Sequence, residues 1–138
     1  MSLQRTGSIP LPRGREAGFD HADVWLGGDG ARMYVAHTGA DRVEVIDCRQ
    51  RVFLRSIEDQ PGVAGVLIDQ AQDVLFTSDR ACARISVFRC SDEALLGRVA
   101  AGPTRTGSRT TASGAVCTAS TSASRWAKAA QRRSSIST

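Results

Sequence analysis

Apolar and polar residues alternate along two stretches of the chain. In the first, Val43 and Val45 alternate with Arg42 and Glu44, and the same alternation recurs in residues 84–89. A period of two places successive side chains on opposite faces of a pleated strand. The pattern therefore predicts β-strands.

The two stretches belong to a repeat with a period of 42 residues. Without any gap, residues 32–48 align with residues 74–90, so that Tyr34 meets Phe76 and Cys48 meets Cys90. The match extends outward on both sides of these segments. Self-similarity at a fixed period of this size is typical of a repeat architecture.

Short segments rich in Gly, Asp or Pro divide each repeat. Such residues supply the positive φ angles and the side-chain-to-backbone hydrogen bonds that tight turns need. In the first repeat they separate four expected strands, at about residues 23–26, 32–37, 42–47 and 52–57. Four strands in about 40 to 45 residues is the size of one blade of a β-propeller.

We therefore predict an all-β protein with two four-stranded antiparallel blades of an incomplete β-propeller, followed by an irregular tail. Closed propellers use about four to eight blades, and the recognisable repeats here number two. The expected organisation is an N-terminal lead-in at 1–19, blade 1 at 20–61, blade 2 at 62–103 and the tail at 104–138.

The segment "YVAHTGADRVEVID", residues 34–47, resembles the YVTN-type propeller repeat, in which an aromatic-led strand and a small polar turn precede a strand ending in Val-Ile-Asp. Ala36 and His37 stand where Thr and Asn are usual, and the second repeat is looser. The lead-in "IPLPRGREAGFDH" resembles the segment that often precedes a first blade. The resemblance covers residues 9–103 and implies a truncated relative of lactonase-like and surface-layer-type propellers. It specifies fold more than function, because propellers host many unrelated activities.

The tail, residues 104–138, differs in charge from the rest of the chain. It holds six Lys or Arg and no Asp or Glu, so the first 103 residues carry twelve basic and fourteen acidic groups. A basic arm could bind nucleic acid, but the charges are dispersed and Trp126 stands alone, so no nucleic-acid partner is expected. A Ser/Thr/Ala-rich disordered extension is a second interpretation.

A third interpretation is that the tail is the third blade translated out of frame. If one nucleotide were missing just after Pro103, the codons of "TRTGSRTT" would permit "HPNGLAYD" in the restored frame. That reading places a glycine at position 107, 42 residues after Gly65, and restores the pattern of "AGVLID". The hypothesis predicts that further repeats follow in the restored frame.

The sequence offers little chemistry. The two histidines are not paired at helical spacing and the four cysteines show no CxxC spacing, so neither a metal site nor a cofactor is predicted. Five polar residues lie at strand ends, where propellers commonly present loops to a ligand, although Asp and His there also cap turns. These candidate ligand-binding residues are Asp20, His21, His37, Asp79 and Arg80. No catalytic residue is predicted.

Two function classes remain open. The first is a non-enzymatic binding or scaffolding module whose partner is an unknown protein or small molecule, with self-association through open blade edges as a further option. The second is a remnant of a propeller enzyme, either a lactonase-like hydrolase or a redox enzyme. No signal peptide or membrane-spanning stretch is readable, so a cytoplasmic location is the default expectation, although relatives of this repeat type are often exported.

Overall fold

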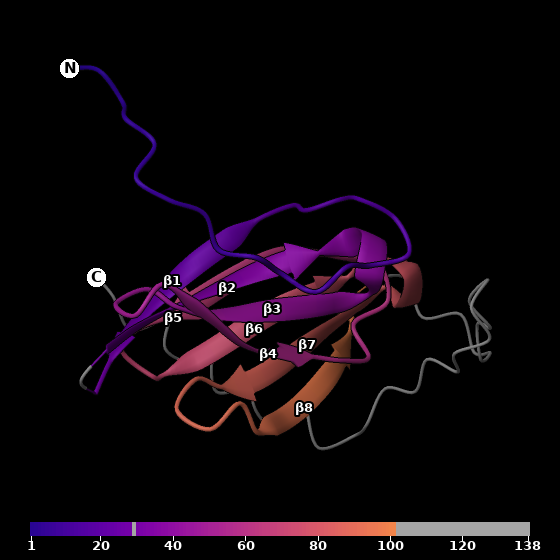
Figure 1. Ribbon diagram of the computed structural model, residues 1–138. Coiled ribbons are helices and arrows are strands. Elements are labelled where there is room, and N and C mark those ends of the chain that lie inside the picture. Colours follow the sequence, from indigo (N-terminus) through magenta and orange to yellow (C-terminus); the bar gives the residue numbers. More distant parts are fainter. Residues whose placement is uncertain (29, 102–138) are drawn as a thin grey trace.

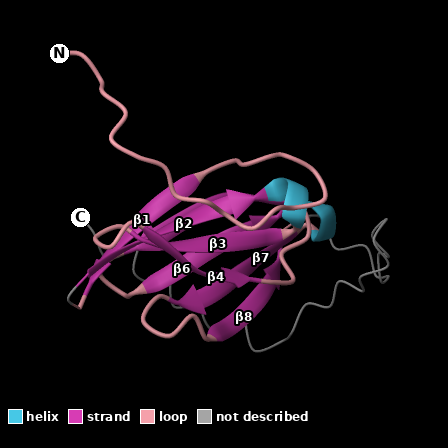
Figure 2. Ribbon diagram, viewed as in Figure 1, coloured by secondary structure: helices cyan, strands magenta, loops and turns pink. Residues whose placement is uncertain are grey.

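The computed structural model describes residues 1–28 and 30–101, and it is all-β. The first sheet is antiparallel, in the order β1 (Ala22–Gly27), β2 (Gly30–His37), β3 (Arg42–Asp47) and β4 (Val52–Ile57). The second has the order β5 (Val63–Asp69), β6 (Val74–Asp79), β7 (Arg84–Arg89) and β8 (Leu95–Ala100). The prediction of two four-stranded antiparallel sheets is confirmed (Figures 1 and 2). The interpretations of residues 104–138 lie outside the described residues.

The 42-residue period is also present in the local geometry. The turns after β2 and β6 are short 3₁₀ helices, η1 (Thr38–Ala40) and η2 (Arg80–Cys82), and each ends at a residue with a left-handed backbone. These residues are Asp41, with a φ of 54°, and Ala83, with a φ of 46°. Each third strand also shifts its register with the fourth strand at the same point of the repeat. Figure 2 shows η1 and η2 together at one end of the molecule.

Each sheet has a forward face and a rear face, and residues 42 positions apart lie on faces of the same name. The forward face of the first sheet carries side chains that are buried between the sheets, including Trp25, Tyr34 and Val43. The rear face of the second sheet supplies the other half of the core, including Val66, Leu75 and Phe88. The repeat equivalents of Trp25, Tyr34 and Val43 are Leu67, Phe76 and Ile85. These lie on the forward face of the second sheet, which is the face away from the core between the sheets. The forward face of the first sheet therefore packs against the rear face of the second, so the two sheets do not present equivalent faces to each other.

Polar contacts fix the relative position of the two sheets. The hydroxyl of buried Tyr34 donates to the Cys90 carbonyl oxygen at 3.0 Å, and the indole nitrogen of Trp25 donates to Asp73 Oδ1 at 2.9 Å. The Asp23 carboxylate accepts the backbone N–H of Ile68 at 2.8 Å. Satisfying buried polar groups in this way restricts the sheets to one mutual orientation.

The lead-in crosses the rear face of the first sheet, as Figure 1 shows. Its backbone is held to η1 and to β3, because Gly39 N donates to Gly18 O at 3.1 Å and Arg42 Nη2 donates to Pro12 O at 3.1 Å. Position 39 must be glycine at this approach, since a Cβ would collide with the carbonyl oxygen of Glu16. The rear face of the first sheet is thus covered in part by the segment that precedes it.

Candidate functional site

Three of the five predicted site residues meet at the surface. Arg80 Nη2 donates to Asp20 Oδ2 at 2.9 Å, and His21 Nδ1 lies 2.7 Å from Asp20 Oδ1. Asp20 precedes β1 and Arg80 begins η2, so this chain of contacts links the lead-in to the second sheet. All three groups remain partly or largely exposed, and ion pairs in such places contribute little to stability.

The other two predicted residues are buried, each within its own sheet. His37 is 3% exposed and lies at the end of β2, where its Nδ1 is 2.7 Å from Glu44 Oε1 on β3. Asp79 is 1% exposed and occupies the equivalent end of β6. Within residues 1–28 and 30–101, the side-chain hydrogen bonds and ion pairs of His37 and Asp79 go to residues other than Asp20, His21 and Arg80.

Glu44 is the centre of the polar cluster on the rear face of the first sheet. Its carboxylate accepts hydrogen bonds from Arg42 Nε at 2.6 Å and from the Ser56 hydroxyl, in addition to its contact with His37. Burial by itself would raise the pKa of Glu44, but the hydrogen bonds from Ser56, His37 and Arg42 outweigh burial and lower it. Because an ionised carboxylate can only accept, the proton in its contact with His37 belongs to Nδ1 of the imidazole.

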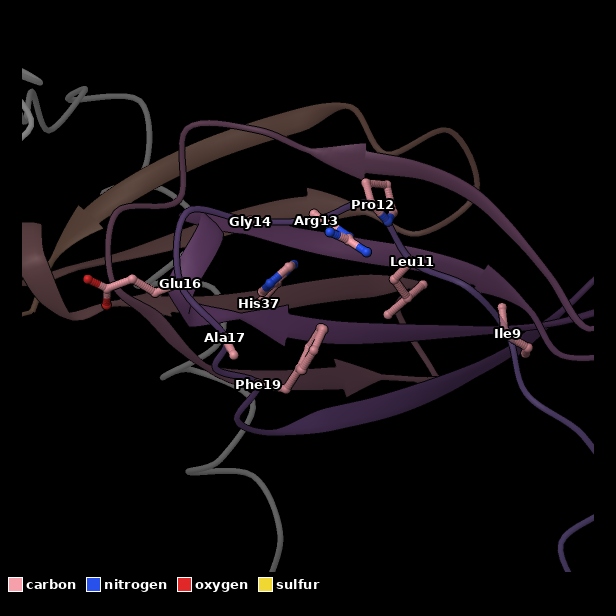
Figure 3. Close-up of a pocket in the computed structure, with 9 residues that line it drawn as sticks. All are labelled: Ile9, Leu11, Pro12, Arg13, Gly14, Glu16, Ala17, Phe19 and His37. Carbon is pink, nitrogen blue, oxygen red and sulfur yellow. The ribbon is translucent and has the colours of Figure 1, made fainter.

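His37 therefore turns its second ring nitrogen, Nε2, away from Glu44 and toward the lead-in. A Cβ placed on Gly14 would lie 3.0 Å from that nitrogen, so the lead-in backbone passes directly over it. The ring of Phe19 stacks on the imidazole, with centroids 4.2 Å apart and planes inclined by 23°. Figure 3 shows His37 beneath the loop of the lead-in, between Arg13 and Phe19.

An open cavity of about 480 Å³ lies beside His37, between the lead-in and the first sheet. Its size falls within the range of small-molecule sites, which is about 300 to 1,000 Å³. Most of its wall is apolar, and Arg13, Glu16 and His37 supply the charged or polar groups. The lining residues drawn in Figure 3 are Ile9, Leu11, Pro12, Arg13, Gly14, Glu16, Ala17, Phe19 and His37.

The second sheet carries a matching cluster around Asp79. Arg84 Nε donates to Asp79 Oδ2 at 2.7 Å and the Ser86 hydroxyl donates to the same oxygen at 2.8 Å, whereas buried Asp79 Oδ1 has no hydrogen-bond partner. Burial, the largest influence, raises the pKa of Asp79 despite these bonds. Arg84 also donates to the Asp59 carbonyl oxygen at 2.7 Å, much as Arg42 donates to Pro12. The equivalent arginines therefore tie each sheet to the segment that precedes it.

The sequence interpretation missed Glu44, Ser56 and Phe19. Part of the signal was available, because alternation places Glu44 on the same face as Arg42, and the 42-residue period aligns Arg42 with Arg84. The position of Phe19 depends on the path of the lead-in, which no local pattern specifies. Within residues 1–28 and 30–101, no three His, Cys, Asp or Glu side chains gather closely enough to hold a metal ion.

Comparison with other proteins does not assign a family. No model of a known protein family matches the chain, and no curated protein matches it. In the described part of the chain, no helix has the length and apolar character needed to cross a membrane.

Proposed function

We propose that this chain is a pair of blades from a β-propeller of the YVTN-repeat kind, and that it acts as a non-enzymatic binding or scaffolding module. One observation carries the proposal: the forward face of the first sheet packs on the rear face of the second. A two-fold symmetric sandwich joins equivalent faces, whereas a repeat array joins each unit to the next through different faces. The packing of unlike faces in this chain supports a repeat array.

The cavity beside His37 is the ligand site that the geometry favours. Its walls suit a small, largely apolar molecule, and His37 Nε2 suits one hydrogen-bond donor on that molecule, such as a hydroxyl. Arg13 at the rim would attract a carboxylate instead. In this proposal the predicted residues Asp20, His21 and Arg80 hold the lead-in to the second sheet at the surface. Asp79 has a structural role in the second sheet.

An NMR titration of the full chain tests this site, with hexanol and hexanoate as probes. We expect saturable shifts in the amide signals of residues 9–19 and in the imidazole signals of His37. Phe19→Ala removes one wall and should abolish the shifts, whereas Leu3→Ala, at a fully exposed lead-in position, should leave them unchanged. If neither probe shifts these signals, or if Phe19→Ala binds as well as the parent chain, the site is wrong.

The membership of a longer propeller is tested at the nucleotide level. Restoring one base after the codon of Pro103 should open a frame that contains further repeats of about 42 residues, each with an aromatic-led strand. An early stop codon in the restored frame, or a frame without such strands, would contradict the frameshift hypothesis.

A remnant of a propeller enzyme is the second candidate, and the contact between His37 and Glu44 favours it. A buried carboxylate that holds Nδ1 leaves Nε2 as a base facing a cavity, which is the arrangement of a general base with its orienting group. No Ser, Thr or Cys is among the described residues that line this cavity, so water would have to be the nucleophile. Lactone hydrolysis by the full chain that is lost in His37→Gln would establish this alternative over the binding module.

A further inference from the structure

The forward face of the second sheet exposes apolar side chains. Leu67 is 64% exposed, and Phe76 and Ile85 are partly exposed. Their repeat equivalents in the first sheet are Trp25, Tyr34 and Val43, each of which is buried between the two sheets. The second sheet thus presents to solvent the same kind of surface that the first sheet buries.

The rear face of the first sheet presents the complementary surface. Val24 is 36% exposed and Leu26 is 69% exposed, and their repeat equivalents Val66 and Ile68 are buried in the core between the sheets. Met33 also lies on this face and is equivalent to buried Leu75. The chain therefore carries, on its two outer surfaces, both halves of the interface that it forms internally.

We propose that these two surfaces bind each other between copies of the chain, so that the rear face of one copy's first sheet docks on the forward face of another copy's second sheet. The established interface between the sheets supplies the geometry, because the same repeat positions would meet. Such a contact joins different patches on the two copies. It is therefore heterologous, and it extends into open chains unless the rotation closes a ring.

The association is concentration-dependent and weaker than the contact within the chain. Two sheets of one chain meet at an effective concentration of about millimolar, an advantage that separate copies lack. The hydrogen bond from Tyr34 to Cys90 is also not reproduced, since Phe76 stands at the equivalent position.

The lead-in competes with this docking. Ile9, Leu11 and Phe19 line a second cavity together with rear-face residues that include Met33 and Val35. A docking copy must displace this segment, while Val24 and Leu26 are already exposed. The lead-in therefore limits association without preventing the first contact.

Sedimentation velocity over a wide concentration range, with the full chain, tests the proposal. The parent chain should associate, and Leu67→Asp or Leu26→Asp should each leave a monomer. Both residues are exposed, so neither substitution should disturb folding, which circular dichroism would verify. An equimolar mixture of the two variants should form a one-to-one dimer and nothing larger, since each variant retains the surface that the other has lost.

Two further variants give the experiment its controls. Leu11→Ser weakens the cover of the rear face and should strengthen association by about tenfold, the equivalent of roughly 1.4 kcal/mol. Val52→Asp, on edge strand β4, should leave association unchanged. The proposal fails if the parent chain is monomeric at every concentration, since the forward face would then have no second copy as its occupant. It also fails if the mixture does not restore the dimer, or if Val52→Asp alone dissociates the copies, which would indicate pairing through strand edges.

Discussion

The polar clusters of the two sheets occupy the same four repeat positions but distribute their charges differently. In the first sheet the carboxylate is Glu44, on the third strand, and His37 ends the second strand. In the second sheet the carboxylate is Asp79, at the end of the second strand, and a serine replaces the glutamate on the third. The other two positions hold Arg42 and Ser56 in the first sheet, and Arg84 and Arg98 in the second.

This exchange changes how well each carboxylate is satisfied. Glu44 receives three donors shared between its two oxygens, and its pKa is lowered. Both donors to Asp79 converge on Oδ2 and leave Oδ1 buried without a partner, and its pKa is raised by burial. The same backbone arrangement thus holds one buried carboxylate with both oxygens hydrogen-bonded and one with an oxygen that has no partner. The position of the carboxylate decides which donors can reach it.

The largest expected effect comes from neutralising the two carboxylates separately. Glu44→Gln should destabilise the fold by about 2 to 3 kcal/mol, since hydrogen bonds to charged groups contribute about 1.5 to 3 kcal/mol each and some survive in the amide. Asp79→Asn should cost less than Glu44→Gln, because Oδ1 of Asp79 has no partner to lose and Arg84 keeps Asp59 Oδ1, 3.7 Å from its Nη2, as a second partner. Urea unfolding of both variants, with exposed Glu16→Gln as the control, measures the difference.

Equal losses in the two variants would contradict this prediction. That result would mean that the unpartnered Asp79 Oδ1 has no energetic consequence, and that Arg84 needs a full charge as much as Arg42 does.

The pH dependence of stability should have opposite signs in the two clusters. Glu44 has a lowered pKa, so its contribution is present above its unfolded pKa and is lost as the pH falls through its folded pKa. Asp79 has a raised pKa, so its contribution is complete below its unfolded pKa and is lost as the pH rises through its folded pKa. On acidification from neutral pH, Glu44→Gln should therefore lose less stability than the parent chain, and Asp79→Asn should lose more.

Urea midpoints measured from neutral pH to below the usual range of carboxyl titration give these slopes. Parallel curves for the parent chain and both variants would show that neither carboxylate contributes a proton-linked term.

The fold could be predicted because its determinants are local. The alternation of Val43 and Val45 and the turn-forming residues placed the expected strands within two residues of the observed ends, as at 32–37 against Gly30–His37. The 42-residue period aligns Arg42 with Arg84, the two arginines that hold the buried carboxylates. Short-range periodicity and turn chemistry depend on neighbours in sequence, which a single chain displays directly.

The site was less accessible to sequence reasoning. Glu44 sits at a polar position of an alternating strand, which ordinarily faces solvent, yet it is fully buried because the lead-in passes over that face. The sequence places His37 and Asp79 at strand ends, but it does not show that both side chains are buried in hydrogen-bonded clusters or that His37 also lines a cavity. Those outcomes depend on long-range packing of the lead-in and of the two sheets, to which no local pattern responds.

The smallest expected effect exchanges the aromatic residues that the repeat aligns. Tyr34→Phe gives the first sheet the residue of the second and removes the bond to the Cys90 carbonyl, so it should cost about 1 kcal/mol, the typical net value of one hydrogen bond. Phe76→Tyr adds a hydroxyl to a partly exposed side chain, where water can satisfy it, and should leave stability unchanged. Urea unfolding at a concentration low enough to keep the chain monomeric separates the two. A comparable loss in both variants would imply that Phe76 is packed as tightly as Tyr34, and that the forward face of the second sheet is covered as fully as that of the first.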